Sequence, residues 1–467
     1  MRNNIIILVA ALAGAYYLVN TAATAQTSVM AGLVVFFITL GISFIRGVEA
    51  LYIIVFAMLF SPEIGMGAGT GRMSGEGTSV ALRLEDILLV AVGCGWLLRT
   101  AYDNRRFGIA RTGVNTGIGV YILACLAATM LGVINGTVNL KTGIFHNLKF
   151  MEYFFLFFMI LAHVRSKKII NRMIAAMMIV FFLAMIYGYT QIELTGNKRV
   201  TAPFDTDEPN TFGGYIALLM CVIFGVVLCD RRIRVRAPLI LLLLFSVPPF
   251  IFTLSRASYM AFIAGWMAFL VFSRQRAVVG ALIVSMAATA LIGVPLLPEK
   301  VQKRITGTFK AETEVHVKIG TVDLDASASA RIVSYQQAVT TWLKSPLLGH
   351  GVTGTHFIDS QYFRLLAETG IVGLSAFLFM IWRLLQETWK VQRDCKDDFQ
   401  RGAALGFFCG IIAMLVHAIS ANSFIIIRIA EPFWLMAGLM LLIPSLKDEK
   451  ETPERAEFHP LNRTVPS

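Results

Sequence analysis

Charge is scarce in this sequence. Of its 467 residues only 15% are Asp, Glu, Lys or Arg, whereas 56% are hydrophobic. A soluble globular domain carries roughly 25% charged residues, so the composition excludes an ordinary soluble protein and indicates a membrane protein. The net charge of +12 does not indicate a nucleic-acid partner, because the basic residues stand in short clusters between apolar runs.

Several other features are missing. The six cysteines lack the spacing of a metal site, and the topology predicted below places all of them in the bilayer or on the cytoplasmic side. We therefore expect no disulfide framework. The sequence has no repeat of fixed period and no low-complexity region. The apolar run in the first twenty residues has no small-residue cleavage site followed by a polar region, which favours a first transmembrane helix over a removed signal peptide.

Long apolar runs are abundant. A membrane-spanning helix needs about 20 predominantly apolar residues, and the sequence predicts an all-α polytopic membrane protein with about fourteen such helices. A count of twelve or thirteen remains open, because the fourth run is short and the ninth and tenth are nearly continuous. The predicted spans are 4–20, 28–45, 48–62, 84–99, 114–135, 148–164, 170–189, 211–229, 237–253, 257–273, 278–297, 368–387, 402–420 and 424–444.

Basic clusters follow every even-numbered span. Lys and Arg in short loops stay on the cytoplasmic side, so this pattern predicts that both termini are cytoplasmic and that the odd-numbered spans end outside. The clusters contain Arg46; Arg99, Arg105, Arg106 and Arg111; Arg165, Lys167, Lys168 and Arg172; Arg231, Arg232, Arg234 and Arg236; Arg274 and Arg276; Lys390, Arg393, Lys396 and Arg401.

The predicted spans divide the chain into four parts. Residues 1–297 hold spans 1 to 11, residues 298–367 form one large extracytoplasmic loop, residues 368–444 hold spans 12 to 14, and residues 445–467 form a cytoplasmic tail. Within the large loop, EVHVKIGTVDLD alternates polar and apolar residues about a Gly-Thr centre, which predicts a small hairpin. Residues 328–344 are predicted to form an amphipathic helix.

Three arginines are predicted to stand on the extracytoplasmic side, at or near membrane depth: Arg199, Arg256 and Arg428. An arginine inside a span costs at least about 2.5 kcal/mol, so it is retained where it pairs or binds a ligand. Arg199 could instead be an ordinary loop residue, and Arg428 could form an intrahelical pair with Glu431. The guanidinium fork suits phosphate and diphosphate oxygens, which favours an anionic lipid headgroup as ligand.

Three segments, found in order between about residues 200 and 375, carry a family resemblance. The segment LKSPLLGHGVTGTHFIDSQYFRLLAETGIVG closely resembles the signature of the O-antigen ligase/polymerase superfamily, and DEPNTFGGYIALLM and FTLSRASYMAFIAG are similar to two earlier family segments. The matching residues are Pro346, Gly349, Gly351, Ser360, Tyr362, Leu365, Glu368 and Gly370, with Arg331 and Trp342 upstream, then Pro209, Asn210 and Tyr215, and finally Thr253, Ser255 and Arg256.

The resemblance implies an inverting, metal-independent glycosyltransferase of the GT-C type, which needs no cofactor. It would act at the periplasmic face of the bacterial inner membrane on a glycan carried by undecaprenyl diphosphate. Arg199 and Arg256 would hold the donor diphosphate, with Arg428 in support. The other partners would be a glycan acceptor, the lipid bilayer, and flippase and chain-length regulator proteins. Candidate sugar contacts are Ser360, Gln361, Tyr362, Arg364, Asn210 and Arg331.

The chain departs from the family pattern at one position. The histidine that is the presumed base in the ligases is replaced by Asp359, with His350 and His356 as nearby alternatives. A carboxylate can accept the acceptor proton, especially if a dry site raises its pKa. Asp359 could instead cap the helix that begins near Ser360. The two histidines and Asp359 match no metal motif.

The replacement by aspartate favours a polysaccharide polymerase over a ligase, which would transfer the glycan to lipid A core or another terminal acceptor. A flippase or an envelope scaffold is an alternative of another class. Other polar residues have simpler interpretations. Asp205 and Asp207 are expected in an acidic loop, His417 is expected to be packed and hydrogen-bonded rather than catalytic, and Lys149 is expected to pair locally with Glu152.

Overall fold

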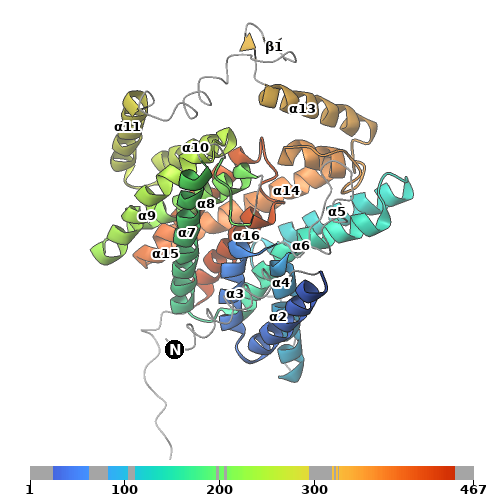
Figure 1. The fold of residues 1–467 in the computed structure, drawn as a ribbon, viewed down its shortest axis with the longest axis horizontal. Helices are drawn as coiled ribbons and strands as arrows, with labels where there is room; N and C mark the ends of the chain where they lie inside the picture. Colours follow the sequence, from blue (N-terminus) through green and yellow to red (C-terminus); the bar gives the residue numbers. More distant parts are fainter. Residues whose placement is uncertain are drawn as a thin grey trace, which may run out of the picture.

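The computed structural model describes residues 25–62, 83–103, 111–195, 199–204, 208–293, 318–319, 322–323 and 326–446. Within these residues the chain forms fourteen α-helices, one hairpin and a short 3-10 helix (Figure 1). The helices are α2 (Ala25–Ile45), α3 (Gly47–Phe60), α4 (Leu84–Tyr102), α5 (Asn115–Ile134), α6 (Leu140–His163), α7 (Lys167–Thr195), α8 (Pro209–Cys229), α9 (Ile233–Phe252), α10 (Arg256–Phe272), α11 (Arg276–Gly293), α13 (Ala326–Lys344), α14 (Gln361–Asp394), α15 (Asp398–His417), α16 (Ile427–Leu442) and η3 (Ile443–Ser445).

The helices agree with the predicted spans. The first predicted span, 4–20, lies outside the described residues, as does the pair Asp205 and Asp207. Each of the other thirteen spans coincides with a helix. Eight described helices are long and apolar enough to cross a membrane, and three further apolar helices are shorter. The described residues are thus those of a predominantly helical polytopic membrane protein, while the count of fourteen spans stays a prediction.

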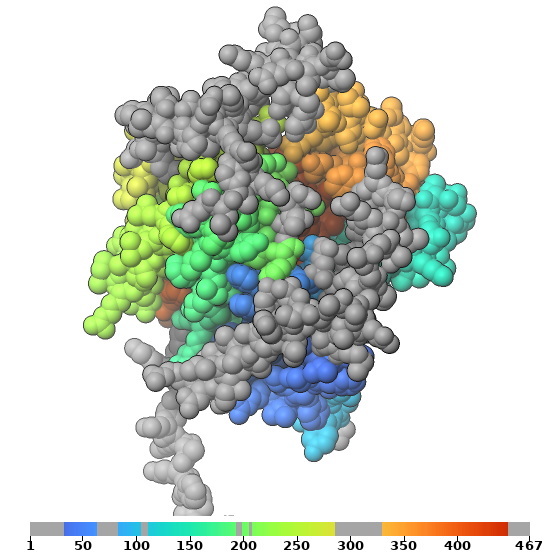
Figure 2. Space-filling view, in the orientation of Figure 1, coloured from blue at the N-terminus to red at the C-terminus, as the bar shows by residue number. Residues whose placement is uncertain are grey.

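The predicted elements of the large loop are also present. Strands β1 (Lys318–Ile319) and β2 (Val322–Asp323) pair in antiparallel register, with Ile319 opposite Val322. Helix α13 follows the hairpin and covers the region predicted to be an amphipathic helix. Figure 1 shows α13 at one end of the molecule and α2 at the other, and Figure 2 shows these two ends in orange and dark blue.

Helix α8 forms the centre of the bundle, and all its residues from Thr211 to Leu228 are buried. Its closest neighbour is α15, and glycines make this approach feasible. A Cβ atom on Gly225 would lie 2.3 Å from the Gly402 carbonyl oxygen, and one on Gly406 would lie 2.5 Å from the Cys221 carbonyl oxygen. Small residues let membrane helices pack backbone to backbone, so this contact fixes the two helices whose ends carry the site.

Helix α14 is interrupted near its start. Gly370 has a φ of 64°, and a Cβ atom there would lie 2.3 Å from the Leu347 carbonyl oxygen. The segment after α13 packs into this break, since the amides of His350 and Gly351 donate to the carbonyls of Ala367 and Glu368 at 3.0 and 2.8 Å. The Pro-x-x-Gly-x-Gly motif therefore locks the loop before α14 onto α14 itself.

Candidate functional site

Arg199 joins three segments. Its Nε donates to the Thr253 carbonyl at 2.9 Å, and its Nη2 donates to the Leu254 carbonyl at 3.1 Å and to Asn210 Oδ1 at 3.4 Å. Leu254 has a φ of 50°, in the left-handed region that a non-glycine residue rarely adopts. Arg199 therefore holds the strained turn that leads into α10.

Arg256 is the first residue of α10 and directly follows that turn. Ser255 caps the helix, because its Oγ accepts a hydrogen bond from the Ser258 amide at 3.2 Å. A helix N-terminus carries partial positive charge, and the half-buried guanidinium of Arg256 adds a full one. Cationic character is thus concentrated at this end of α10.

Arg428 lies in the first turn of α16 and is only 1% exposed. It donates to the Leu59 carbonyl at 3.3 Å and to the Pro203 carbonyl. The alternative of an intrahelical pair with Glu431 is wrong. Among the described residues neither carboxylate oxygen of Glu431 has a hydrogen-bond partner, because the guanidinium reaches across to α3 and to the segment 199–204 instead.

Asp359 pairs with Arg331 of α13 across 3.4 Å. Burial raises the pKa of the Asp359 carboxyl above its ordinary value, Arg331 opposes the rise, and the Glu208 carboxylate adds to it. The alternative that Asp359 caps α14 is wrong, since Ser360 occupies the cap position and makes no side-chain capping bond there. Burial favours proton uptake by this carboxyl, whereas the guanidinium favours its ionised form, which is the form that a general base needs.

The two neighbouring histidines lie differently. His350 is anchored, with its Nε2 2.9 Å from the Thr341 carbonyl oxygen and its own carbonyl accepting from Thr137 Oγ1 at 2.7 Å. His356 is exposed on the loop. Within the described ranges no group of three His, Cys, Asp or Glu side chains could hold a metal ion.

The side chains at the start of α14 make their hydrogen bonds within the helix bundle. Ser360 Oγ contacts the Ala418 carbonyl at 3.5 Å, the side-chain oxygen Oε1 of Gln361 accepts from the Phe424 amide at 3.2 Å, and Tyr362 donates to the Leu415 carbonyl at 2.7 Å. Arg364 pairs with Glu368 at 3.1 Å. The bonds of Ser360, Gln361 and Tyr362 attach α14 to α15 and to the loop between α15 and α16, whereas the Arg364–Glu368 pair lies within α14.

The loop between α15 and α16 connects the segments that carry Arg199 and Arg256 with the Arg331–Asp359 pair. Tyr335 of α13 donates to the Ile419 carbonyl at 2.9 Å, and Asn422 Nδ2 donates to the Ile358 carbonyl at 3.0 Å, one residue before Asp359. At the base of the loop, His417 Nε2 lies 3.2 Å from Ser258 Oγ in α10. The turn before α10, which Arg199 and Arg256 flank, and the Arg331–Asp359 pair are therefore attached to the same end of α15.

Sequence reasoning missed two parts of this arrangement. The first is Glu208, whose carboxylate is close enough to raise the pKa of Asp359. The two residues are 151 positions apart, so the sequence does not indicate this proximity. The local signal was the place of Glu208 just before Pro209 at the start of α8. Ser258 and Ser423 flank His417. The spacing of Ser255 and Ser258 beside Arg256 was the available signal for the first of these serines.

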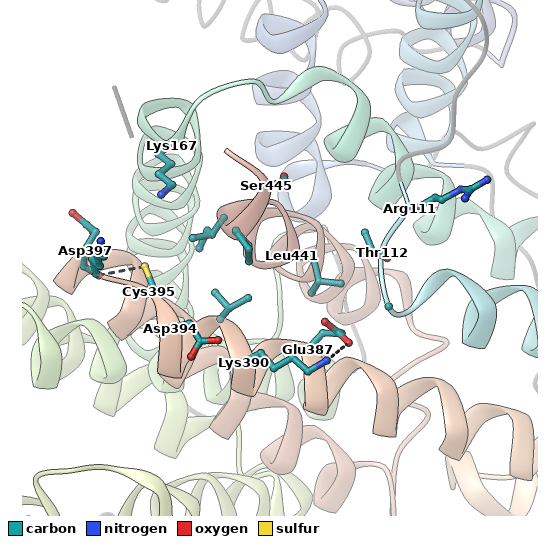
Figure 3. Close-up of a pocket in the computed structure, with 15 residues that line it drawn as sticks. Arg111, Thr112, Lys167, Glu387, Lys390, Asp394, Cys395, Asp397, Leu441 and Ser445 are labelled. Atoms are coloured by element: carbon teal, nitrogen blue, oxygen red, sulfur yellow. Dashed lines mark hydrogen bonds and ion pairs between the residues drawn. The ribbon is translucent and has the colours of Figure 1, made fainter. Parts of the chain in front are cut away.

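A cavity of about 660 Å³ lies elsewhere, at the opposite ends of α7, α14 and α16 (Figure 3). Its walls carry both signs of charge, and Lys390 already pairs with Glu387 at 2.9 Å. None of the candidate site residues lines it. The lining residues are Arg111, Thr112, Gly113, Lys167, Glu387, Lys390, Val391, Asp394, Cys395, Lys396, Asp397, Leu441, Ile443, Pro444 and Ser445.

The fold and the site define a class, a polytopic helical membrane protein with arginines and a carboxylate gathered at one end of its bundle. Residues 241–378 match the sequence model of a family described as O-antigen ligase. The resemblance to the O-antigen ligase/polymerase superfamily is therefore confirmed for this part of the chain. The matched range includes Arg256, Arg331 and Asp359. No protein among the curated ones matched the chain.

Proposed function

We propose that this protein is a polysaccharide polymerase that moves a glycan from undecaprenyl diphosphate onto the next lipid-linked repeat unit. The observation that carries the proposal is the attachment of Arg199, Arg256 and the Arg331–Asp359 pair to one end of the bundle. The basic clusters at the other ends of the helices support a periplasmic position for this end, with both termini in the cytoplasm of a bacterial inner membrane.

The chemistry assigned to each group follows from charge. An acceptor hydroxyl attacks the anomeric carbon of the donor glycan, its proton passes to the Asp359 carboxylate, and the bond to the diphosphate oxygen breaks. The negative charge that accumulates on the departing diphosphate is stabilised by Arg256 and Arg199, with Arg428 holding the adjacent backbone. Preorganised cations at a site of low dielectric constant are effective in this role. No metal is required.

Asp359 in place of the family's histidine favours the polymerase over the second candidate, a ligase that uses lipid A core or another terminal acceptor. A flippase is less well supported, because transporters place their polar sites near the bilayer midplane between broken helices. Here the arginines of the candidate site gather at helix ends and loops.

The deciding experiment incubates purified protein with lipid-linked repeat units alone, without nucleotide or added metal. A ladder of products supports the polymerase, and product formed only with a lipid A acceptor supports the ligase. Arg256→Ala should abolish either product. Arg276→Ala is the matched control, because Arg276 is also the first residue of its helix but belongs to a basic cluster at the other end. Retained activity in Arg256→Ala overturns the proposal.

In cells, the same pair of variants separates the enzyme from a flippase. Loss of a polymerase leaves single lipid-linked repeat units accumulating at the periplasmic face, whereas loss of a flippase traps them at the cytoplasmic face. Accumulation inside the cell in the Arg256→Ala strain would show that this protein moves the lipid rather than joining the glycans.

A further inference from the structure

A chain of buried polar groups lies directly beneath the arginines. His417, at the end of α15, is fully buried, as are Ser255 and Ser258 of the α10 N-terminus. His417 Nδ1 lies 2.7 Å from Ser423 Oγ, and its Nε2 lies 3.2 Å from Ser258 Oγ. Both ring nitrogens are therefore engaged by serine hydroxyls.

Ser258 is the branch point of this chain. Its Oγ lies 2.8 Å from Ser255 Oγ, and Ser255 caps the helix that begins with Arg256. The same hydroxyl donates to the Asn210 carbonyl at 3.4 Å, and the Asn210 side chain accepts from Arg199. Each of the two arginines is thus linked to Ser258 through a single intervening residue.

Two successive glycines in α8 make room for this branch point. A Cβ atom on Gly213 would lie 2.3 Å from Ser258 Oγ, and one on Gly214 would lie 2.8 Å from His417 Cε1. The close approach brings three helices, α8, α10 and α15, together at one buried hydrogen-bonded centre. A polar group buried at such a place is costly unless every partner is correctly oriented.

We propose that His417 and Ser258 are positioning residues that set the separation and direction of Arg199 and Arg256 for the donor diphosphate. The inference rests on the proposed function, which assigns the diphosphate to these two arginines. His417 does not touch the donor. It fixes Ser258, and Ser258 fixes the cap of α10 on one side and Asn210 on the other.

The chemistry of the ligand explains why such a device is needed. Two guanidinium groups bind one diphosphate well only if their forks match the spacing of its oxygens. Errors of about 1 Å in a binding group cost up to 10²-fold in rate. A rigid neutral centre that ties both arginine segments together prevents them from moving apart.

The test measures binding of undecaprenyl diphosphate itself to the full-length protein in detergent, by competition or native mass spectrometry. Ser258→Ala and His417→Ala should each weaken this binding by about five- to tenfold, the effect of one lost hydrogen bond in a binding site. His417→Gln keeps an amide donor that can reach Ser258, and it should recover most of the affinity.

A glycine pair distinguishes positioning from general damage to the fold. Gly214→Ala pushes on His417 from a different helix and should weaken binding like His417→Ala. Gly225→Ala disturbs the same α8–α15 contact near the far end of α8, where a Cβ atom would meet Gly402, and it should lower thermal stability without changing affinity. Equal losses of affinity in both glycine variants would overturn the positioning role.

Arg256→Ala separates the two levels of inference. If it leaves binding of undecaprenyl diphosphate unchanged, the proposed function fails. If it weakens binding while Ser258→Ala and His417→Ala do not, only the positioning role fails. The inference holds when Arg256→Ala, Ser258→Ala and His417→Ala all weaken binding and His417→Gln restores it.

Discussion

Removal of the Arg331 charge should change the pH dependence of glycan transfer. In the proposed reaction Asp359 accepts the acceptor proton and can do so only when it is ionised, so the rate should fall as the pH drops through the pKa of this carboxyl. Burial raises that pKa, and Arg331 opposes the rise. The variant Arg331→Gln leaves the burial in place and removes the opposing charge, so the acid limb of the profile should move to higher pH.

The size of this shift follows from the distance. At the 3.4 Å between Arg331 Nη2 and Asp359 Oδ2, two unit charges attract by about 1.2 kcal/mol in a medium as polar as water. This value is a lower bound, because the Asp359 side chain is only 37% exposed and the medium around a partly buried pair is less polar than water. One pH unit corresponds to about 1.4 kcal/mol, so the limb should move by roughly one unit or more.

The assay records initial rates of ladder formation from lipid-linked repeat units between about pH 5 and pH 9. Arg331→Lys is the control, because it keeps a positive charge near Asp359 and should leave the limb close to its original position. At high pH, where Asp359 is ionised in every variant, Arg331→Gln should approach the rate of Arg331→Lys.

Two results would contradict this reasoning. If Arg331→Gln leaves the acid limb in place, the ion pair does not set the charge state of the base. If Asp359→Asn retains more than about one hundredth of the rate, Asp359 is not the base, because general-base catalysis contributes about 10²- to 10⁴-fold.

Further predictions concern the backbone around the site. Arg199→Ala should lower the free energy of unfolding by about 2 to 4 kcal/mol, as expected for lost charge-assisted bonds to two carbonyls, and adding Leu254→Gly should recover about 1 kcal/mol by relieving strain; thermal melts in detergent check both. Arg199→Lys keeps the charge but cannot hold two carbonyls in the same plane, so binding of undecaprenyl diphosphate should stay well below that of the unmodified protein. Gly349→Ala should lower the melting temperature, since Gly349 has a φ of 65° and a Cβ atom would lie 2.5 Å from the Glu368 backbone, whereas Gly119→Ala has open space and should not. A chelator should leave the transfer rate unchanged.

The helices were predictable from the sequence because hydropathy reports directly on what crosses a membrane. The predicted spans 211–229 and 402–420 lie over α8 and α15, with boundaries that differ by a few residues. The hairpin and α13 followed from alternation and from an amphipathic pattern. The local pair of Lys149 and Glu152 is confirmed at 3.3 Å, although Lys149 also contacts Asp86 of α4.

Contacts between distant segments were not predictable in the same way. Glu431 was the obvious partner for Arg428 at a spacing of three residues, yet Arg428 donates to Pro203 and Leu59. Hydropathy gives no information on which loop comes to lie over which helix end. For the same reason, one alternative interpretation of Asp359 was a helix cap. Its partner Arg331 is 28 positions away in the sequence, and the structure was needed to identify it.

Arg199 and Arg428 each donate hydrogen bonds to backbone carbonyls, and such a side chain can still bind a ligand with its remaining N–H groups. A guanidinium has five N–H donors, and a long side chain loses about 2 kcal/mol of rotamer entropy when it is ordered. Bonds from Arg199 to Thr253 and Leu254 order that side chain before any donor arrives. The cost of ordering is then met during folding rather than during binding, which is how preorganised sites gain affinity. A lysine at position 199 would carry the same charge without the planar fork, so it would have to be ordered by the diphosphate itself. The binding measured for Arg199→Lys therefore reports on preorganisation and not on charge.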